Sequence, residues 1–247
     1  MKKIAIITDF GTKDPYVGIM KGKILSFLED VVFIDITHDI PEFDVTAGLF
    51  IFKYALKHLP EDFHFLIVID PGVGGKRRPI FAVSEGRFFV APDNGILTPL
   101  KEIADFYEIT MFKPESSTFH GRDIFAPALG KLLSGTAPDE VGKRIHDPEE
   151  IYLPEPEKTE KGLLGRIIYI DRFGNLITNI TAEDVRIGER VMFKNRLLMV
   201  VNTYQDVRKG EPLALIDSFE HLEIAVREGN AKEFFDAKVG DPVLLEK

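Results

Sequence analysis

The 247-residue sequence contains no cysteine. This absence excludes disulfide bonds, thiolate metal sites and a cysteine nucleophile, and it fits a reducing compartment. The sequence also lacks any apolar run near the roughly 18 residues that a membrane-spanning helix requires. The apolar run 4–7 is short and is soon followed by Asp9, which is typical of a first strand and not of a secretion signal. We therefore expect a cytoplasmic protein that does not enter a membrane.

An excess of basic charge is lacking as well. The formal net charge of −9 argues against nonspecific binding to nucleic acid phosphates. Metal-binding spacings such as HxH or HExxH do not occur, and neither does the G-x-S-x-G turn of a serine nucleophile. We therefore expect no bound metal, no cofactor and no nucleic acid partner.

Apolar residues make up 45% of the sequence, enough for one large domain or two modest ones. In the first 150 residues, β-type runs alternate with helical stretches, which favours an α/β sheet flanked by helices. We expect strands at 3–7, 31–36, 65–69, 79–83 and 88–91, and helices at 18–30, 44–59 and 124–133. Asp44 is the expected N-cap of the second helix, and Pro60 its stop.

The pattern changes after residue 146. The segment 147–161 is acidic and contains Pro148, Pro154 and Pro156 without apolar periodicity. Short β-type runs follow at 164–170, 176–180, 190–193, 197–201, 213–216, 222–226 and 242–245. We expect an α/β domain at 1–150, a linker at 151–161 and a smaller all-β barrel at 162–247.

Two aspartates follow predicted parallel strands. Asp9 follows the first strand, and Asp70 follows the strand at 65–69. Ligands of parallel α/β sheets bind beyond the carboxyl ends of the strands, so these residues are candidates for one shared site. Each aspartate alone has the simpler interpretation of a turn or helix cap.

Asp70 opens a glycine-rich turn, 70–75, that favours close approach of a ligand to the backbone. The turn matches neither a phosphate-binding P-loop nor a dinucleotide-binding fingerprint. Lys76, Arg77 and Arg78 follow it. These three side chains form either a solvated basic turn or a set in which one arginine pairs with Asp70.

His120 lies in the polar loop Phe119-His120-Gly121-Arg122-Asp123, just before a predicted helix. That position suits catalysis better than core packing, while Asp123 is a candidate N-cap. For residues 91–95, a plain tight turn is at least as good an explanation as a functional role. In the second half, the turn 171–175, Tyr204 and the stretch 217–219 are further strand-end candidates.

Together these motifs resemble the S-adenosyl-L-methionine hydrolases, also called SAM hydroxide adenosyltransferases, which are related to fluorinating and chlorinating enzymes. The resemblance extends over nearly the whole chain. The stretches that carry it are Thr8–Gly11, Asp14, Tyr16–Gly18, Lys21–Gly22, Asp70–Gly74, Ala91–Gly95, Phe119–Asp123, Phe173–Asn175, Ser218–Phe219 and Leu222–Val226.

The resemblance implies an N-terminal α/β domain, a C-terminal β-barrel and a homotrimer, with substrate bound between domains of neighbouring subunits. The implied reaction converts S-adenosyl-L-methionine and water to adenosine and L-methionine. An Asp-Arg-His set typical of the hydrolases falls on Asp70, Arg77 and His120. The halogenases alter that set and bind halide near the position of Gly121, and the fluorinases carry an extra loop for which this chain is too short.

The resemblance also implies binding roles. Asp9 would hold the ribose hydroxyls, and Phe43 would pack near the ribose or sulfonium. Asp14, Asp171 and Ser218 would contact the methionine end of the substrate. Adenine would be held by Phe173, Asn175, Tyr204, Glu223 and the backbone around Val226. A relative's arginine that meets the methionine carboxylate is Phe219 here, which leaves that contact to Ser218 or to backbone amides.

The mechanism that fits these residues is in-line attack of water on C5′. His120 is a candidate acceptor of the water proton near neutral pH, Arg77 a candidate holder of the water oxygen, and Asp70 would orient Arg77. Two alternatives remain open from the sequence: a halogenase of the same superfamily, and a protein that binds adenosine or S-adenosyl-L-methionine without turnover.

Overall fold

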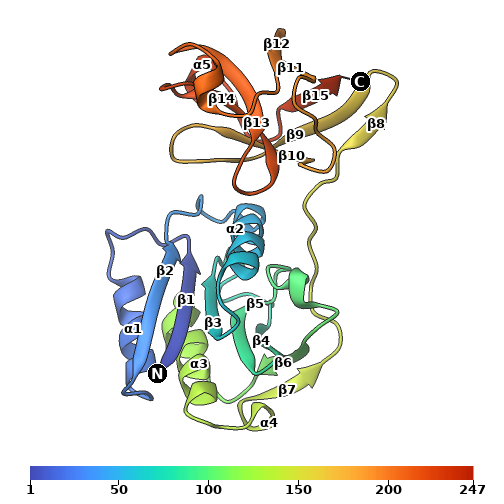
Figure 1. The fold of residues 1–247 in the computed structure, drawn as a ribbon. Helices are drawn as coiled ribbons and strands as arrows, with labels where there is room; N and C mark the ends of the chain where they lie inside the picture. The colour runs from blue at the N-terminus through green and yellow to red at the C-terminus, as the bar shows by residue number, and fades with distance from the viewer. Residues whose placement is uncertain (247) are drawn as a thin grey trace. The chain divides into compact units, whose positions relative to one another are not determined.

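Two sheets contain the strands of residues 1–246, the part of the chain that the computed structural model describes. The chain divides into two units, Met1–Tyr152 and Leu153–Lys247 (Figure 1). The first unit is mixed α/β and the second is built almost wholly from antiparallel strands, so the predicted fold class is confirmed.

The sheet of the first unit has the strand order β2-β1-β3-β5-β4-β6-β7. Its strands are β1 Lys2–Thr8, β2 Val31–Thr37, β3 Phe63–Val68, β4 Pro79–Ser84, β5 Arg87–Pro92, β6 Asp105–Ile109 and β7 Gly142–Ile145. The pairs from β2 to β5 along this order are parallel, and the remaining pairs are antiparallel. The carboxyl ends of β1 and β3 therefore lie at the same edge.

Helices cover both faces of this sheet (Figure 1). On one face, α1 (Tyr16–Leu25) and α3 (Ala126–Leu133) contribute to a buried cluster with Ile4, Leu66 and Phe81. On the other face, α2 (Val45–His58) places Phe52 against Phe65 and Phe89. Gly48 allows this helix to approach closely, because a Cβ there would lie 2.3 Å from Ile69 Cδ1.

The helix α2 begins after Asp44, whose side chain accepts the N–H of Ala47, so its predicted N-cap is confirmed. The helix predicted at 18–30 ends instead at Leu25. Ser26 closes the helix by donating its hydroxyl to the Lys23 carbonyl. Phe27 and Leu28 lie beyond the helix but still pack against buried residues, so the apolar spacing continues past its end. This explains why the predicted helix was too long.

The helix predicted at 124–133 is preceded by a π-helical turn, Gly121–Phe125. Asp123 lies inside this turn, so its assignment as an N-cap is wrong. The Asp123 carboxylate instead accepts the backbone N–H groups of Glu115 and Ser116 and pairs with Arg122. A π-helical turn is an uncommon conformation that is frequent at functional sites.

In the second unit the strands follow the order β12-β11-β15-β9-β10-β14-β13. They are β9 Gly162–Ile170, β10 Leu176–Thr181, β11 Arg190–Phe193, β12 Arg196–Met199, β13 Pro212–Ile216, β14 His221–Val226 and β15 Pro242–Glu246. A bridge between Val200 and Ala214 joins the two ends of this order, which makes the sheet a nearly closed barrel. The short helix α5, Ala231–Phe235, packs beside β14.

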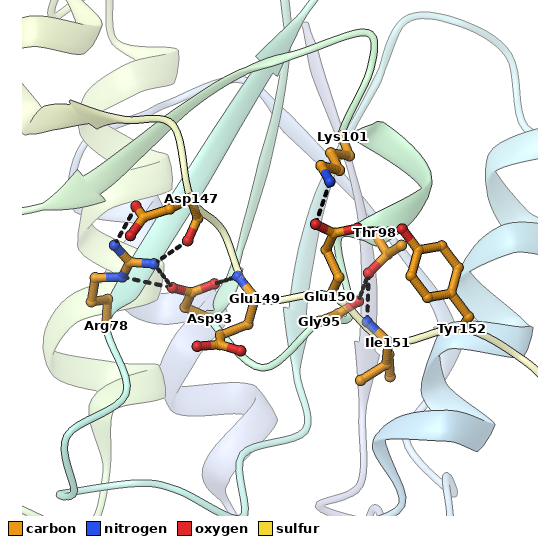
Figure 2. Close-up of polar contacts among 10 residues, drawn as sticks. All are labelled: Arg78, Asp93, Gly95, Thr98, Lys101, Asp147, Glu149, Glu150, Ile151 and Tyr152. Atoms are coloured by element: carbon orange, nitrogen blue, oxygen red, sulfur yellow. Dashed lines mark hydrogen bonds and ion pairs between the residues drawn. The ribbon is translucent and has the colours of Figure 1, made fainter.

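The segment after β7 is held to the first unit through residue 152 (Figure 2). Arg78 donates to Asp93 at 2.7 Å and to Asp147 at 2.8 Å. Asp93 also accepts the backbone N–H of Glu149 at 2.8 Å. Within the predicted linker, Glu157–Thr159 form β8, which pairs with β9. This strand is exposed and largely charged, so it carries no apolar signal in the sequence.

The sequence patterns did not predict β6 and β7, which extend the antiparallel side of the sheet beyond β4. β7 spans only Gly142–Ile145 and has two exposed residues in its centre. No helix among the described residues is long and apolar enough to cross a membrane.

A buried histidine makes the stability of the first unit depend on pH. Burial lowers the pKa of His64 to about 4, and its Nδ1 accepts the backbone N–H of Phe88 at 3.1 Å. Because folding depresses this pKa, the stabilisation is present above pH 6.5 and is lost as the pH falls toward 4. The shift corresponds to a loss of up to about 3 kcal/mol.

We predict that His64→Asn, which retains an acceptor for Phe88, flattens this pH dependence. Denaturant unfolding at pH 7 and pH 4.5 measures the free energies of both proteins. An equal loss of stability in the parent and the variant would contradict the assignment.

Candidate active site

A cavity of about 350 Å³ lies where β1 and β3 end. Thr8 is opposite Val68 in this parallel pair, so Asp9 and Asp70 follow neighbouring strand ends. The residues that line the cavity are Asp9, Phe10, Tyr16, Glu42, Phe43, Val68, Asp70, Val73, Thr118, Phe119, His120 and Gly121. All of them belong to the first unit.

Asp9 and Phe43 are held together at the cavity. The Asp9 carboxylate accepts the backbone N–H of Phe43 at 3.0 Å. Burial raises the pKa of Asp9, and the hydrogen bond from Phe43 opposes that shift. Phe43 has φ of 65°, a left-handed conformation that few residues other than glycine adopt, and its side chain is 65% exposed. The backbone thus presents an aromatic ring beside a carboxylate.

Thr8 and His38 fix the backbone that carries Asp9. Both are buried, and Thr8 Oγ1 lies 2.9 Å from His38 Nδ1. The His38 carbonyl also accepts the N–H of Gly11 at 2.7 Å. The loop after β1 is therefore tied to the loop after β2, next to the strand end.

Three aromatic rings form one wall of the cavity. Phe10, Tyr16 and Phe119 lie with their ring centroids 5.1–6.1 Å apart. They come from the loop after β1, from α1 and from the loop before the π-helical turn. Such rings offer apolar surface and electron-rich faces to a ligand.

Arg77 joins Asp70 to His120. Its Nε donates to Asp70 Oδ1 at 2.8 Å, and its Nη2 pairs with Asp70 Oδ2 and lies 2.8 Å from His120 Nδ1. The guanidinium also lies over the buried Phe125 ring, 5.1 Å from its centroid. Arg77, and not Arg78, is thus the arginine that folds back onto Asp70.

The glycines after Asp70 make room for protein atoms. A Cβ on Gly72 would lie 3.0 Å from Arg77 Cγ, and one on Gly74 would lie 2.4 Å from the Ser117 carbonyl oxygen. Gly74 also has φ of +74°. The structure thus places Arg77 and Ser117 against these glycines, while Asp70 and Val73 of the same turn line the cavity.

Burial lowers the pKa of His120, and the charge of Arg77 lowers it further, against the opposing effects of Asp70 and Asp123. His120 is 8% exposed. Within residues 1–246, His120 Nε2 and Arg77 Nη1 are buried without a hydrogen-bond partner. A buried donor left unpaired costs about 1–3 kcal/mol. Of these two residues, His120 lines the cavity, so its Nε2 is the atom of the pair that a ligand there could meet.

The turn 91–95 supports this site from behind. Asn94 donates its side-chain N–H to the carbonyl of Ile69 at 2.9 Å, one residue before Asp70. Asp93 is buried and pairs with Arg78 on the side of residue 147. The turn therefore positions the end of β3, and it does not line the cavity.

Another set of polar groups lies in the second unit, around the loops of β9, β13 and β14. Asp171 accepts the backbone N–H of Asn175 at 2.8 Å and its side-chain N–H at 3.1 Å. This closes a turn in which Phe173 is 74% exposed. Gly174 packs against Asn230, because a Cβ there would lie 2.1 Å from Asn230 Oδ1.

Tyr204 donates to Glu223 Oε1 at 2.7 Å. Burial raises the pKa of Glu223 to about 7, and it raises the pKa of Asp217 to about 6. Asp217 accepts the N–H groups of Phe219 and His221 and so shapes the turn that carries the exposed Ser218. The carboxylates Asp171, Asp217 and Glu223 act on one another electrostatically.

The structure brings together several of the candidate residues. Asp9, Phe43, Asp70 and His120 line one cavity, with Arg77 bound between the last two. In the other unit, Asp171 bonds Asn175 and Tyr204 bonds Glu223. The remaining candidates of that unit are Phe173, Ser218 and Val226. Asp14 is exposed and lies outside the lining of the described cavity.

Sequence reasoning did not single out Glu42 and Thr118, which line the cavity, and it gave no role to Val73, which lines the cavity from within the turn 70–75. Glu42 and Thr118 each lie one position from Phe43 or Phe119 and carry no pattern of their own. In the described part of the chain, no group of three or more His, Cys, Asp or Glu side chains is arranged to hold a metal ion.

Comparison with known proteins relates both units to one family. Residues 4–142 match the N-terminal domain of the SAM hydroxide adenosyltransferases, and residues 165–244 match their C-terminal domain. The solved structure of an uncharacterized conserved protein from Thermotoga maritima is similar, with a TM-score of 0.89 and 34% identity over 99% of this chain and 100% of that chain.

Full-length relatives carry functional names. The (R)-S-adenosyl-L-methionine hydrolase of Thermus thermophilus is 33% identical over 99% of this chain and 100% of its own length. A protein of the same name from Methanocaldococcus jannaschii is 34% identical over 97% of this chain and 94% of its own. A fluorinase from an Actinoplanes species matches at 28%, over 99% of this chain and 97% of its own. On these matches, the chain belongs to the SAM hydroxide adenosyltransferase family.

Proposed function

We propose that this protein is an enzyme that hydrolyses S-adenosyl-L-methionine to adenosine and L-methionine. The observation that carries the proposal is the buried Asp70–Arg77–His120 chain beside the cavity, in a protein whose whole length matches relatives named as hydrolases of this substrate. The fluorinase relatives are less similar, which favours water over halide as the nucleophile.

In this reaction the oxygen of water attacks C5′ of the substrate. The C5′–S bond breaks, its electron pair goes to the cationic sulfur, and neutral methionine leaves. One proton is released as the new 5′-hydroxyl forms. Because the leaving group is already excellent, the protein contributes mainly by holding water, C5′ and sulfur in line.

The first unit supplies the reacting end of the site. Asp9 accepts hydrogen bonds from the ribose hydroxyls, and the Phe43 N–H holds its carboxylate in place. Phe43 packs on the ribose, and the aromatic wall faces the sulfonium. Arg77 and His120 hold the attacking oxygen, with Asp70 fixing the guanidinium.

The second unit supplies the contacts to adenine and methionine. Phe173 offers an exposed ring for stacking, with Asn175, Tyr204, Glu223 and the backbone at Val226 around the adenine edge. Asp171 and Ser218 contact the methionine end, together with Asp14 of the first unit. We propose a homotrimer with its active sites at subunit interfaces, as the family resemblance implies. We also propose a cytoplasmic location, with which the cysteine-free composition accords.

Arg77→Lys tests the role of the guanidinium. Lysine keeps the charge beside Asp70 but lacks the planar fork that bridges Asp70 and His120. We predict that kcat falls by about 10²-fold, the effect of losing one well-placed donor. Arg78→Lys is the matched control, because Arg78 bonds Asp93 and Asp147 away from the cavity. Equal kcat values for the two variants would contradict the role of Arg77.

Incubation with S-adenosyl-L-methionine in ¹⁸O-labelled water tests the reaction itself. We predict one ¹⁸O atom in the 5′-hydroxyl of adenosine and stoichiometric L-methionine. Chloride or fluoride is added in parallel. Halogenated deoxyadenosine would instead identify a halogenase, and tight adenosine binding without methionine release would identify a binding protein.

The exposed Phe173 ring makes a prediction about binding. Phe173→Ala removes a ring that is 74% exposed, so the free energy of unfolding should change by less than about 0.5 kcal/mol. Loss of ring stacking on adenine should raise KM by about tenfold. Phe234→Ala, in which a ring 43% exposed on the same unit is removed, serves as the control. An unchanged KM for Phe173→Ala would remove this residue from the adenine site.

A further inference from the structure

The hydrogen bond between Arg77 and His120 fixes where the imidazole carries its proton. Arg77 Nη2 lies 2.8 Å from His120 Nδ1. A guanidinium has donors and no acceptor, so Nδ1 must offer its lone pair in this bond. The neutral imidazole therefore carries its hydrogen on Nε2.

The neutral form is also the form that this environment favours. Protonation of Nδ1 would set an N–H against the Arg77 donor, in a place where His120 is 8% exposed. Both effects lower the pKa of His120, burial first and Arg77 second. Asp70 and Asp123 oppose them, but Asp70 is already paired with Arg77 and Asp123 with Arg122.

The orientation of the ring is set before any ligand binds. Two bonds to Asp70 and the ring of Phe125 hold the Arg77 guanidinium. Turning the imidazole over would place a carbon against Arg77 Nη2 and leave the N–H of Nη2 that does not bond Asp70 without its acceptor. Gly121 keeps this region close-packed, since a Cβ there would lie 2.8 Å from Met20 Sδ. His120 lines the cavity, and among residues 1–246 its buried Nε2 is the ring nitrogen that has no hydrogen-bond partner.

We propose that His120 acts on the nucleophile as a hydrogen-bond donor through Nε2–H and does not accept the proton of the attacking water. The proposal rests on the proposed function and replaces the role of general base that the sequence suggests for His120. Neither ring nitrogen offers a free lone pair: Nδ1 is engaged by Arg77 and Nε2 is protonated.

The reaction balances with His120 unchanged. The water oxygen accepts the Nε2–H bond and directs a lone pair at C5′. As the C5′–O bond forms, the C5′–S bond breaks and its electron pair goes to sulfur. The protonated 5′-oxygen is a strong acid and loses its proton to solvent. The same Nε2–H then donates to the 5′-hydroxyl of adenosine.

The proton position on His120 is directly measurable by NMR. The full-length protein, labelled with ¹⁵N-histidine and free of substrate, is recorded at pH 7, and His120 is assigned by the signal missing from His120→Gln. We expect one unprotonated nitrogen, Nδ1, and one protonated nitrogen, Nε2. A proton on Nδ1, alone or together with one on Nε2, would overturn the proposal.

Amide substitution gives a second, kinetic test. The amide nitrogen of glutamine can reach about the position of the histidine Nε2, so glutamine can donate to the cavity without being a base. We expect His120→Gln to retain kcat within about tenfold of the parent and His120→Ala to lose clearly more. If His120→Gln matched His120→Ala and both lost the about 10²–10⁴-fold of a missing general base, the donor role would be wrong.

The two experiments separate this inference from the proposed function. The NMR result does not depend on turnover, so a protein that fails to hydrolyse S-adenosyl-L-methionine still reports its His120 proton. Conversely, a protein that forms labelled adenosine but carries its His120 hydrogen on Nδ1 would support the hydrolase function and contradict the role of Nε2–H as donor. Thermal unfolding of both variants shows that they are folded.

Discussion

The paired bonds between Arg77 and Asp70 determine the rest of the candidate site. They hold a guanidinium against the buried ring of Phe125 and leave its Nη2 within 2.8 Å of His120 Nδ1. Most surface ion pairs contribute little to stability, whereas this one is buried, bidentate and linked to a third group. Its main consequence is orientation, because it sets which nitrogen of His120 bears the hydrogen that borders the cavity.

Much of the structure serves to place this chain of contacts. The parallel pairing of β1 and β3 brings Asp9 and Asp70 to one edge, and Asn94 fixes the carbonyl just before Asp70. The π-helical turn at Gly121–Phe125 follows His120 directly and lets Asp123 tie down the 115–119 loop. The second unit carries a separate set of polar residues, in which burial raises the pKa values of Glu223 and Asp217.

The sequence predicted the α/β and β-barrel classes, the N-cap at Asp44 and the strand ends at Asp9 and Asp70, because these follow from apolar periodicity and chain topology. It did not predict the π-helical turn. It also did not predict that the glycines beside Asp70 leave space for other protein atoms, because this depends on contacts with distant residues such as Ser117. The sequence also did not predict which ring nitrogen of His120 carries the hydrogen, because this position depends on which arginine contacts the ring. No sequence pattern predicted that three further residues line the cavity, namely Glu42, Val73 and Thr118.

The most direct test of this account is a crystal structure of the protein with adenosine. We predict the ribose hydroxyls at Asp9 and the 5′-oxygen about 2.7–3.2 Å from His120 Nε2, with Arg77 still bound to Nδ1. Adenosine bound outside the cavity, or with its 5′-oxygen out of hydrogen-bond reach of His120, would contradict it.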